Sequence, residues 1–228
     1  MDQTAVRLRH ELKYSIDRGA CALLRERLGA VMRPDAHAGA GGYEVRSLYF
    51  DDMYGSAYGD KSAGLLRREK FRLRIYDGDD GCIKLERKAK VGALCHKESE
   101  RLSRASYDAL LAGELPAPDT TGLRGALRTA ARTRLLRPAV IVEYRREAFV
   151  CDAGNVRVTF DRDLCACVGD TDLFSDRLRR LPCCRPGFLL MEVKFDDFIP
   201  DEIYSLLQLN GLQVSTFSKY YLCRKFAR

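Results

Sequence analysis

Residues 70–89 read KFRLRIYDGDDGCIKLERKA, and this stretch decides the fold class. Apolar and charged side chains alternate within 70–76 and again within 82–89, which is the period of a half-buried strand. The acidic segment 77–81 between them contains two glycines and is typical of a hairpin connection. The stretch therefore predicts two neighbouring antiparallel strands, each with one apolar and one basic face.

The same alternation predicts strands along most of the chain. They are Leu8–Ser15, Tyr43–Phe50, Lys70–Tyr76, Cys82–Ala89, Leu94–Arg101, Ala139–Val150, Val156–Asp161 and Phe188–Phe195, with a short ninth near Val214–Leu222. Helical periodicity predicts helices at Arg18–Met32, Ser103–Leu111, Gly122–Leu136 and Asp201–Leu209. We expect an α+β protein, an antiparallel β-barrel tunnel of about eight strands with peripheral helices, formed as a single domain over residues 1–228.

The composition favours an anionic partner. The chain of 228 residues carries a formal net charge of +7 with a pI near 9.0, and its 46% of hydrophobic residues suffices to bury a core. Nucleic acid, a phosphorylated small molecule, a phosphate polymer and a membrane surface all fit this charge. The sequence contains no signal peptide and no apolar run of about 18 residues, and its nine cysteines are irregularly spaced. We therefore expect a soluble, cytoplasmic protein with reduced thiols and no membrane span.

The charged residues of the predicted strands gather on one face of each strand. Arg72 and Arg74 share a face, because residues two apart in a strand point the same way. The comparable sets are Arg9, Glu11 and Lys13; Lys84, Glu86 and Lys88; Arg157, Thr159 and Asp161; and Glu192 and Lys194. Such faces can be exposed to solvent or enclosed in the barrel. The excess of Arg and Lys in so many strands, and the need of the helices for apolar surface to cover, favour the enclosed arrangement.

An enclosed basic face requires a counter-charge. A barrel of about eight strands is just wide enough to hold a slender ligand. Isolated buried cations are costly, so such an interior must be hydrated and filled by anions. A linear phosphate chain fits, because it is narrow, carries about one negative charge per unit and matches the forked donors of arginine.

The chain also resembles a known family through eight short motifs in order. They are RHELKY (9–14), SLYFD (47–51), RLR (72–74), LERK (85–88), YRREAF (144–149), RVTFD (157–161), MEVK (191–194) and SKY (218–220). From about residue 7 to residue 224 the sequence resembles the VTC (vacuolar transporter chaperone) polyphosphate polymerase domain. That domain belongs to the triphosphate tunnel metalloenzyme, or CYTH-like, superfamily.

The resemblance implies a β-tunnel whose basic residues hold ATP and the growing polyphosphate. The phosphate ligands that it implies are Lys13, Arg72, Arg74, Lys88, Lys97, Arg146 and Lys219, and the charged strand faces add Lys84, Arg157 and Lys194. Arg145 has the opposite parity to Arg146 and is an alternative to it. Glu192 would be the main protein contact to Mn²⁺ or Mg²⁺, with Glu11 and Glu86 as weaker metal candidates. The residues that would carry catalysis are Arg72, Arg74, Lys88, Arg146 and Glu192.

Two departures from the family pattern bear on activity. Arg9 replaces the first acidic residue of the superfamily's N-terminal motif, which favours the VTC-like branch over the triphosphatase branch. Thr216 stands where the family has the first lysine of Lys-Phe-Ser-Lys, so one phosphate contact is missing.

The predicted function is metal-dependent transfer of the γ-phosphate of ATP to polyphosphate. A hydrolase of triphosphate or nucleoside triphosphate and a non-catalytic polyphosphate sensor remain alternatives. We expect no nucleic acid partner, because a duplex is too wide for an eight-stranded barrel. The sequence leaves open whether a membrane protein is a partner. The aromatic residues Tyr49 and Tyr220 are interpreted as core.

Overall fold

The computed structural model describes residues 9–37, 39, 41–92, 94–209 and 212–227, and within them ten strands form one antiparallel sheet. The strands are β1 (His10–Ile16), β2 (Arg33–Pro34), β3 (Tyr43–Asp51), β4 (Arg67–Tyr76), β5 (Asp79–Val91), β6 (Leu94–Leu102), β7 (Arg137–Cys151), β8 (Val156–Val168), β9 (Arg179–Pro182) and β10 (Leu189–Phe195). The helices are α1 (Arg18–Gly29), α2 (Ser56–Ser62), α3 (Arg104–Leu111), α4 (Gly122–Arg134), α5 (Asp201–Leu207) and α6 (Lys219–Phe226), with a 3₁₀ turn at Ala153–Asn155. The predicted α+β class is confirmed.

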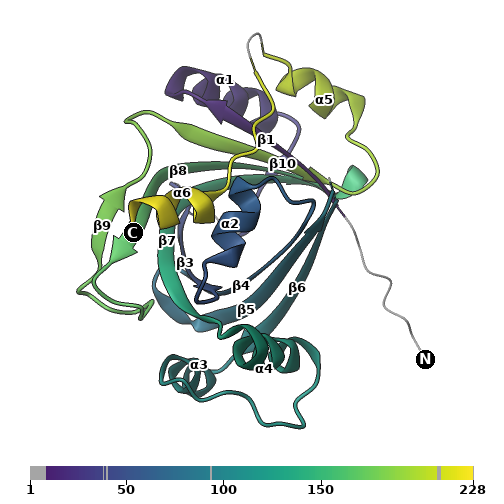
Figure 1. Cartoon of the computed structure of the whole chain (residues 1–228). Helices are drawn as coiled ribbons and strands as arrows, with labels where there is room; N and C mark the ends of the chain where they lie inside the picture. The colour runs from purple at the N-terminus through teal and green to yellow at the C-terminus, as the bar shows by residue number, and fades with distance from the viewer. Residues whose placement is uncertain (1–8, 38, 40, 93, 210–211, 228) are drawn as a thin grey trace.

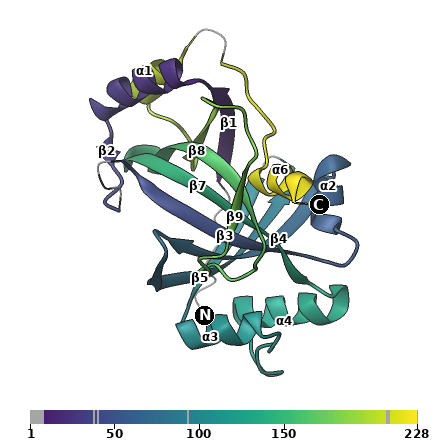
Figure 2. The ribbon, with the colours of Figure 1, turned by 90° about the vertical axis from the view of Figure 1, so that its left-hand side faces the viewer.

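The sheet curls into a tunnel wall. Its strand order is β1-β10-β8-β7-β3-β4-β5-β6, with β2 added on β7 and β9 on β8. Figure 1 shows this path bending round until its end strands approach each other, and Figure 2 shows the same wall after a quarter turn. Between the described residues of the two end strands there is one isolated bridge, where the Arg9 N–H donates to the Cys95 carbonyl at 3.3 Å. The predicted eight-stranded tunnel is confirmed, with an open seam between β1 and β6.

The predicted ninth strand near Val214–Leu222 is wrong. One isolated bridge forms there among the described residues, and the segment then turns into α6. The Ser218 hydroxyl caps this helix by accepting a hydrogen bond from a backbone N–H three residues further on. Tyr220 and Cys223, also three residues apart, are buried on one face of the helix, so the local pattern is helical.

Other differences concern boundaries and short elements. The helix predicted at Arg18–Met32 ends at Gly29, and the first residue of the strand predicted at Leu8–Ser15 lies outside the described residues. β2, β9 and α2 have no predicted counterpart. β2 and β9, with two and four residues, are too short to show a period, and α2 has no buried residue and so no apolar face.

Helices cover the apolar outer face of the tunnel wall. α3 and α4 pack against β4 and β5, where Tyr107 and Leu127 join one buried cluster with Leu73 and Leu85. α1 and α5 cover β8 and β10 in a second cluster. The apolar faces of these strands therefore look outward, and their charged faces look into the curl.

α6 is an exception, because it packs against the inner face. Tyr220 and Cys223 share a third cluster with Val142 and Tyr144 of β7, whereas the neighbouring Ile141 belongs to the outer cluster. α2 lies beside α6 at the same end of the tunnel (Figure 1). The interior is thus apolar beneath α6 and charged elsewhere, which the alternation alone did not predict.

No helix in the described part of the chain is long and apolar enough to cross a membrane.

Candidate functional site

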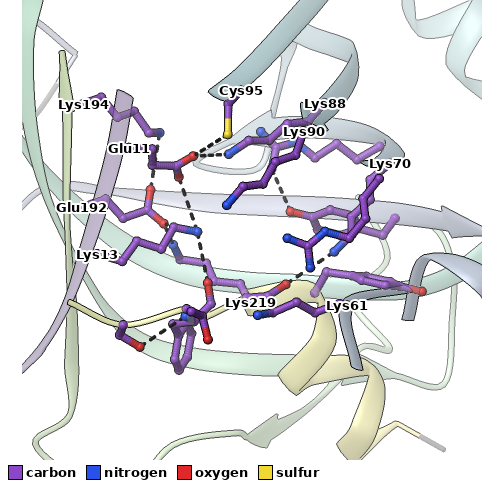
Figure 3. Close-up of a pocket in the computed structure, with 18 of the residues that line it drawn as sticks. Glu11, Lys13, Lys61, Lys70, Lys88, Lys90, Cys95, Glu192, Lys194 and Lys219 are labelled. Atoms are coloured by element: carbon purple, nitrogen blue, oxygen red, sulfur yellow. Dashed lines mark hydrogen bonds and ion pairs between the residues drawn. The ribbon is translucent and has the colours of Figure 1, made fainter. Parts of the chain in front are cut away.

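A cavity of about 560 Å³ lies within the curled sheet, and its lining is strongly basic. Among the described residues, eleven lysines and arginines line it but only two carboxylates, Glu11 and Glu192. The basic residues are Lys13, Lys61, Arg68, Lys70, Arg72, Arg74, Lys88, Lys90, Arg146, Lys194 and Lys219. They come from five strands and from α2 and α6, so the cavity collects side chains from opposite parts of the wall (Figure 3).

Most of the predicted phosphate ligands meet in this cavity. Arg72, Arg74, Lys88 and Arg146 all line it, as the strand faces predict, whereas Arg145 is exposed outside it. The lining also contains three further predicted ligands, Lys13, Lys194 and Lys219.

Three predicted ligands lie outside the lining. Arg157 donates a hydrogen bond of 3.1 Å to the Tyr43 hydroxyl and pairs with Asp35. The Lys84 ammonium lies 5.2 Å from the centre of the Tyr76 ring, and Lys97, which is half-exposed on β6, pairs with Glu86. Each of the three lies directly opposite a cation that does line the cavity: Lys84 opposite Arg74, Lys97 opposite Lys88, and Arg157 opposite Lys194. The period of two therefore predicts the face of a residue, but not the partner that its side chain contacts.

Cross-strand neighbours hold Arg72 and Arg74 of β4. The register places Tyr49 opposite Arg72 and Ser47 opposite Arg74. Arg72 donates to the Tyr49 hydroxyl at 2.7 Å, and Arg74 donates to the Ser47 hydroxyl at 2.9 Å. Tyr144 of β7 accepts a further bond of 3.2 Å from Arg74. Tyr49 and Tyr144 are therefore site residues that the sequence did not reveal, because buried tyrosines are more often core.

Glu86 lies behind these arginines and does not line the cavity. Its side chain is 1% exposed and accepts a hydrogen bond of 2.6 Å from Arg72. Burial would raise the pKa of Glu86, but Arg72, Arg74 and Lys97 hold it well below its usual range. This carboxylate orients the arginines, so the prediction of Glu86 as a metal contact does not match its position.

Glu192 is the centre of a second network. Its carboxylate lies 2.7 Å from Lys219, 3.4 Å from Lys194 and 3.7 Å from both Lys13 and Arg146. Burial would raise the pKa of Glu192, but these four cations hold it well below its ordinary value.

Asp161 supports the same network from β8. It accepts two hydrogen bonds from Arg146, of 2.6 and 2.7 Å, and lies 2.6 Å from Lys219. Burial would lower the pKa of Lys219, but Asp161 and Glu192 raise it. Asp161 was not among the predicted site residues, although it shares the charged face of its strand.

Glu11 bridges the seam of the tunnel. It lies on β1, and its carboxylate is 2.6 Å from Lys88 of β5 and 3.4 Å from Lys13. Burial would raise the pKa of Glu11, but Lys88 and Lys13 lower it. The ion pair therefore joins the two sides of the open seam.

Four lining cations were not predicted: Lys61, Arg68, Lys70 and Lys90. Among the described residues none of them has a carboxylate within ion-pair distance, and Lys70 donates only to the Ser218 hydroxyl, at 3.4 Å. Burial, together with Lys13, Arg68 and Lys88, lowers the pKa of Lys70 to about 7. Arg68 and Lys70 continue the alternation of Arg72 and Arg74, so the sequence held a signal for them. Lys61 lies on the unpredicted helix α2.

The side chains of the cavity suit a divalent cation only if phosphate groups of a substrate supply further ligands. The described residues contain no group of three or more His, Cys, Asp or Glu side chains arranged to hold a metal ion. Mg²⁺ is commonly bound through one or two carboxylates plus substrate phosphates and water, and Mn²⁺ prefers similar oxygen ligands. Glu192 and Glu11, the two carboxylates that line the cavity, match that kind of site.

The comparisons with known proteins agree with this architecture. A family model of the VTC domain matches residues 8–227, while no curated protein matches the chain. Among solved structures, the chain is similar to the PH1819 protein from Pyrococcus horikoshii OT3, with 12% identity and a TM-score of 0.52, over 96% of this chain and 99% of that one.

Two further structures are described as proposed adenylate cyclases. The one from Bacillus halodurans has 14% identity and a TM-score of 0.51, over 89% of this chain and 87% of that one. The one from Vibrio parahaemolyticus has 13% identity and a TM-score of 0.50, over 95% and 97%. At these identities the likeness shows the fold alone.

Proposed function

The chain belongs to the VTC domain family, and on that premise we propose that it is an ATP-dependent polyphosphate polymerase of the cytoplasm. It transfers the γ-phosphate of ATP to the end of a polyphosphate chain held in the basic cavity. The observation that carries this proposal is the composition of one cavity, to whose lining the described residues contribute eleven cations and two carboxylates.

The charge of the cavity supports a polyanionic substrate. Four carboxylates contact its cations, namely Glu11, Glu86, Asp161 and Glu192, and a large positive excess remains. Buried cations without counter-charge are unfavourable, so the excess favours binding of several negative charges at once. Arginine forks suit phosphate oxygens, and the lysines add point charges along the path.

Phosphoryl transfer places modest demands on the protein. A terminal oxygen of the polyphosphate attacks the γ-phosphorus of ATP, the bond to the β-phosphate oxygen breaks, and ADP leaves while the chain gains one unit. Positioning in line and neutralisation of the equatorial oxygens supply most of the catalysis. Arg72, Arg74, Lys88 and Arg146 provide this charge, and no side chain needs to act as nucleophile or general base.

Glu192 and Glu11 are the residues that would hold the metal. When bound, Mn²⁺ or Mg²⁺ would neutralise phosphate charge and hold the phosphates in a defined geometry. Until the substrate binds, Lys219 and Lys88 neutralise these carboxylates at 2.7 and 2.6 Å. The two carboxylates thus have a counter-charge before the substrate binds.

The test is an incubation with ATP and Mn²⁺ in which ADP, free phosphate and polymer are measured separately. Polymer formed in step with ADP supports the polymerase. ADP and free phosphate in equal amounts without polymer would identify a hydrolase, and tight polyphosphate binding without any ADP would identify a sensor.

A further inference from the structure

The basic lining of the cavity divides into two groups by its partners. Seven of the cations contact a carboxylate, as Lys88 contacts Glu11 and Lys219 contacts Glu192. The other four, which we call the unpaired group, are Lys61, Arg68, Lys70 and Lys90, and no described carboxylate pairs with them. Figure 3 shows Lys61, Lys70 and Lys90 on one side of the cavity and Glu11 and Glu192 on the other.

The members of the unpaired group are held close together by the sheet. Arg68 of β4 lies directly opposite Lys90 of β5, and Lys70 lies opposite Lys88. Like charges in such cross-strand positions destabilise a sheet. Lys61 of α2 lies near enough to Arg68 and Lys90 for their charges to lower its pKa, after the larger effect of burial.

The nearest acidic residues serve other groups. Asp51 of β3 accepts hydrogen bonds from the backbone N–H groups of Ala57 and Tyr58, at 2.9 and 3.3 Å. Asp52 accepts from the Ser56 N–H at 2.9 Å. Both carboxylates therefore hold the start of α2, and Glu69 pairs with Arg87 and Arg134. Among the described residues, no ion pair joins these carboxylates, or the nearby Asp60, to the unpaired group.

A second hollow gives these cations room for a ligand. A space of about 370 Å³ lies between α2, β4 and β5, and Arg68, Lys70 and Lys90 line it as well as the main cavity. These three cations therefore stand on the boundary between the two spaces. A linear anion that extended from the main cavity into the second space would contact all three.

From these observations we infer that Lys61, Arg68, Lys70 and Lys90 form a second phosphate subsite, which binds the distal units of a long phosphate chain. The inference rests on the proposed function and adds chain-length selectivity to it. A triphosphate is held by the carboxylate-paired cations and gains little from the subsite. A long chain contacts both groups, so the subsite favours polyphosphate over short phosphates.

The experiment measures the binding of two ligands to two triple variants, each of which removes three positive charges. The subsite variant combines Lys61→Ala, Arg68→Ala and Lys90→Ala, and the control combines Arg18→Ala, Arg132→Ala and Arg185→Ala, three exposed residues that line neither space. Dissociation constants are measured without metal for tripolyphosphate and for long-chain polyphosphate at one ionic strength.

The subsite variant should lose about tenfold or more in affinity for the long chain and less than about threefold for tripolyphosphate. The control should change both affinities by less than about threefold. Thermal melting checks the fold, and removal of like charges should leave the melting temperature of the subsite variant equal or higher.

An equal loss for both ligands, or no loss for the long chain, would overturn the subsite while leaving the proposed function intact. Wild-type protein that binds neither ligand would instead remove the proposed function and the subsite with it. If the triple variant fails to fold, Lys90→Gln alone gives the same comparison, with a loss of about threefold expected for the long chain only.

Discussion

The ammonium of Lys219 donates a hydrogen bond of 2.7 Å to the carboxylate of Glu192. Lys219 is the first residue of α6 and Glu192 lies in β10, so the bond fixes the start of the inner helix to the tunnel wall. The same carboxylate is the one that we propose to contact the metal. Glu192 would therefore have two roles, an ion pair with Lys219 and contact to the proposed metal.

Replacement of Glu192 separates binding from chemistry. Glu192→Gln should lower the rate of phosphoryl transfer by about 100-fold, because the anion that holds the metal is lost. Polyphosphate binding measured without metal should be unchanged or tighter, since a negative charge facing the phosphates is gone. Initial rates over a Mn²⁺ titration and dissociation constants without metal give the two readings. Wild-type rates at every metal concentration would disprove the metal role of Glu192.

Arg74 should affect binding and turnover together. Its side chain lines the cavity, donates to two hydroxyls and lies 3.9 Å from Glu86, which it shares with Arg72. Arg74→Ala should weaken tripolyphosphate binding by about 30-fold and lower the rate of transfer as well. Lys84→Ala is the matched control, because Lys84 shares the predicted face but lies outside the cavity. Comparable losses in the two variants would mean that the phosphates bind elsewhere.

Polyphosphate binding should take up protons near neutral pH. The pKa of Lys70 is lowered to about 7, first by burial and then by Lys13, Arg68 and Lys88. The neighbouring groups on the other elements are Asp51 of β3 and Ser218 and Tyr220 of α6. A bound anion raises this pKa, so between about pH 7 and 9 the complex holds a proton that the free protein lacks.

The affinity for long chains should therefore fall as the pH rises from about 7 to 9, and should be flat below about pH 6. Calorimetry at pH 8 in two buffers of different ionisation enthalpy measures the uptake. Lys70→Arg keeps the charge but removes the titration, so its uptake should be smaller than that of the wild type. Equal uptake in both proteins would assign the protons to other groups.

Glu86 should matter more for stability than any exposed carboxylate of the sheet. It is buried between Arg72, Arg74 and Lys97, so Glu86→Gln leaves their charges uncompensated and should lower the free energy of unfolding by about 3 kcal/mol. Glu100→Gln is the control, because Glu100 pairs with Arg124 on the half-exposed surface and should cost about 1 kcal/mol or less. Urea unfolding of both variants measures the difference, and equal costs would contradict the role of Glu86.

From the sequence alone, the site residues that follow from the alternation of side chains along a strand can be predicted. Arg72, Arg74, Lys88 and Arg146 meet in one cavity because they occupy matching faces of strands that lie far apart in the chain. Arg157 and Lys84 share those faces and lie directly opposite the cavity-lining Lys194 and Arg74, but their side chains contact Tyr43 and Tyr76 instead. Such side-chain contacts are tertiary features that no single strand encodes.

The rest of the site depends on elements that carry no periodic signal. Lys61 enters through α2, a helix of seven residues none of which is buried, and Tyr220 enters through α6, a helix of only eight residues. The seam at Arg9 and Cys95 is likewise a tertiary feature, since it follows from how far the sheet curls. Short elements and sheet curvature are decided by packing rather than by local pattern.

The most direct measurement follows the phosphorus of ATP. The protein is incubated with Mn²⁺ and long-chain polyphosphate, in parallel with ATP labelled on the γ-phosphate and ATP labelled on the α-phosphate. The account predicts that the γ-label enters the polymer in step with ADP formation, that the α-label stays in ADP, and that Arg74→Ala slows both. Recovery of the γ-label as free phosphate, with none in the polymer, would contradict it.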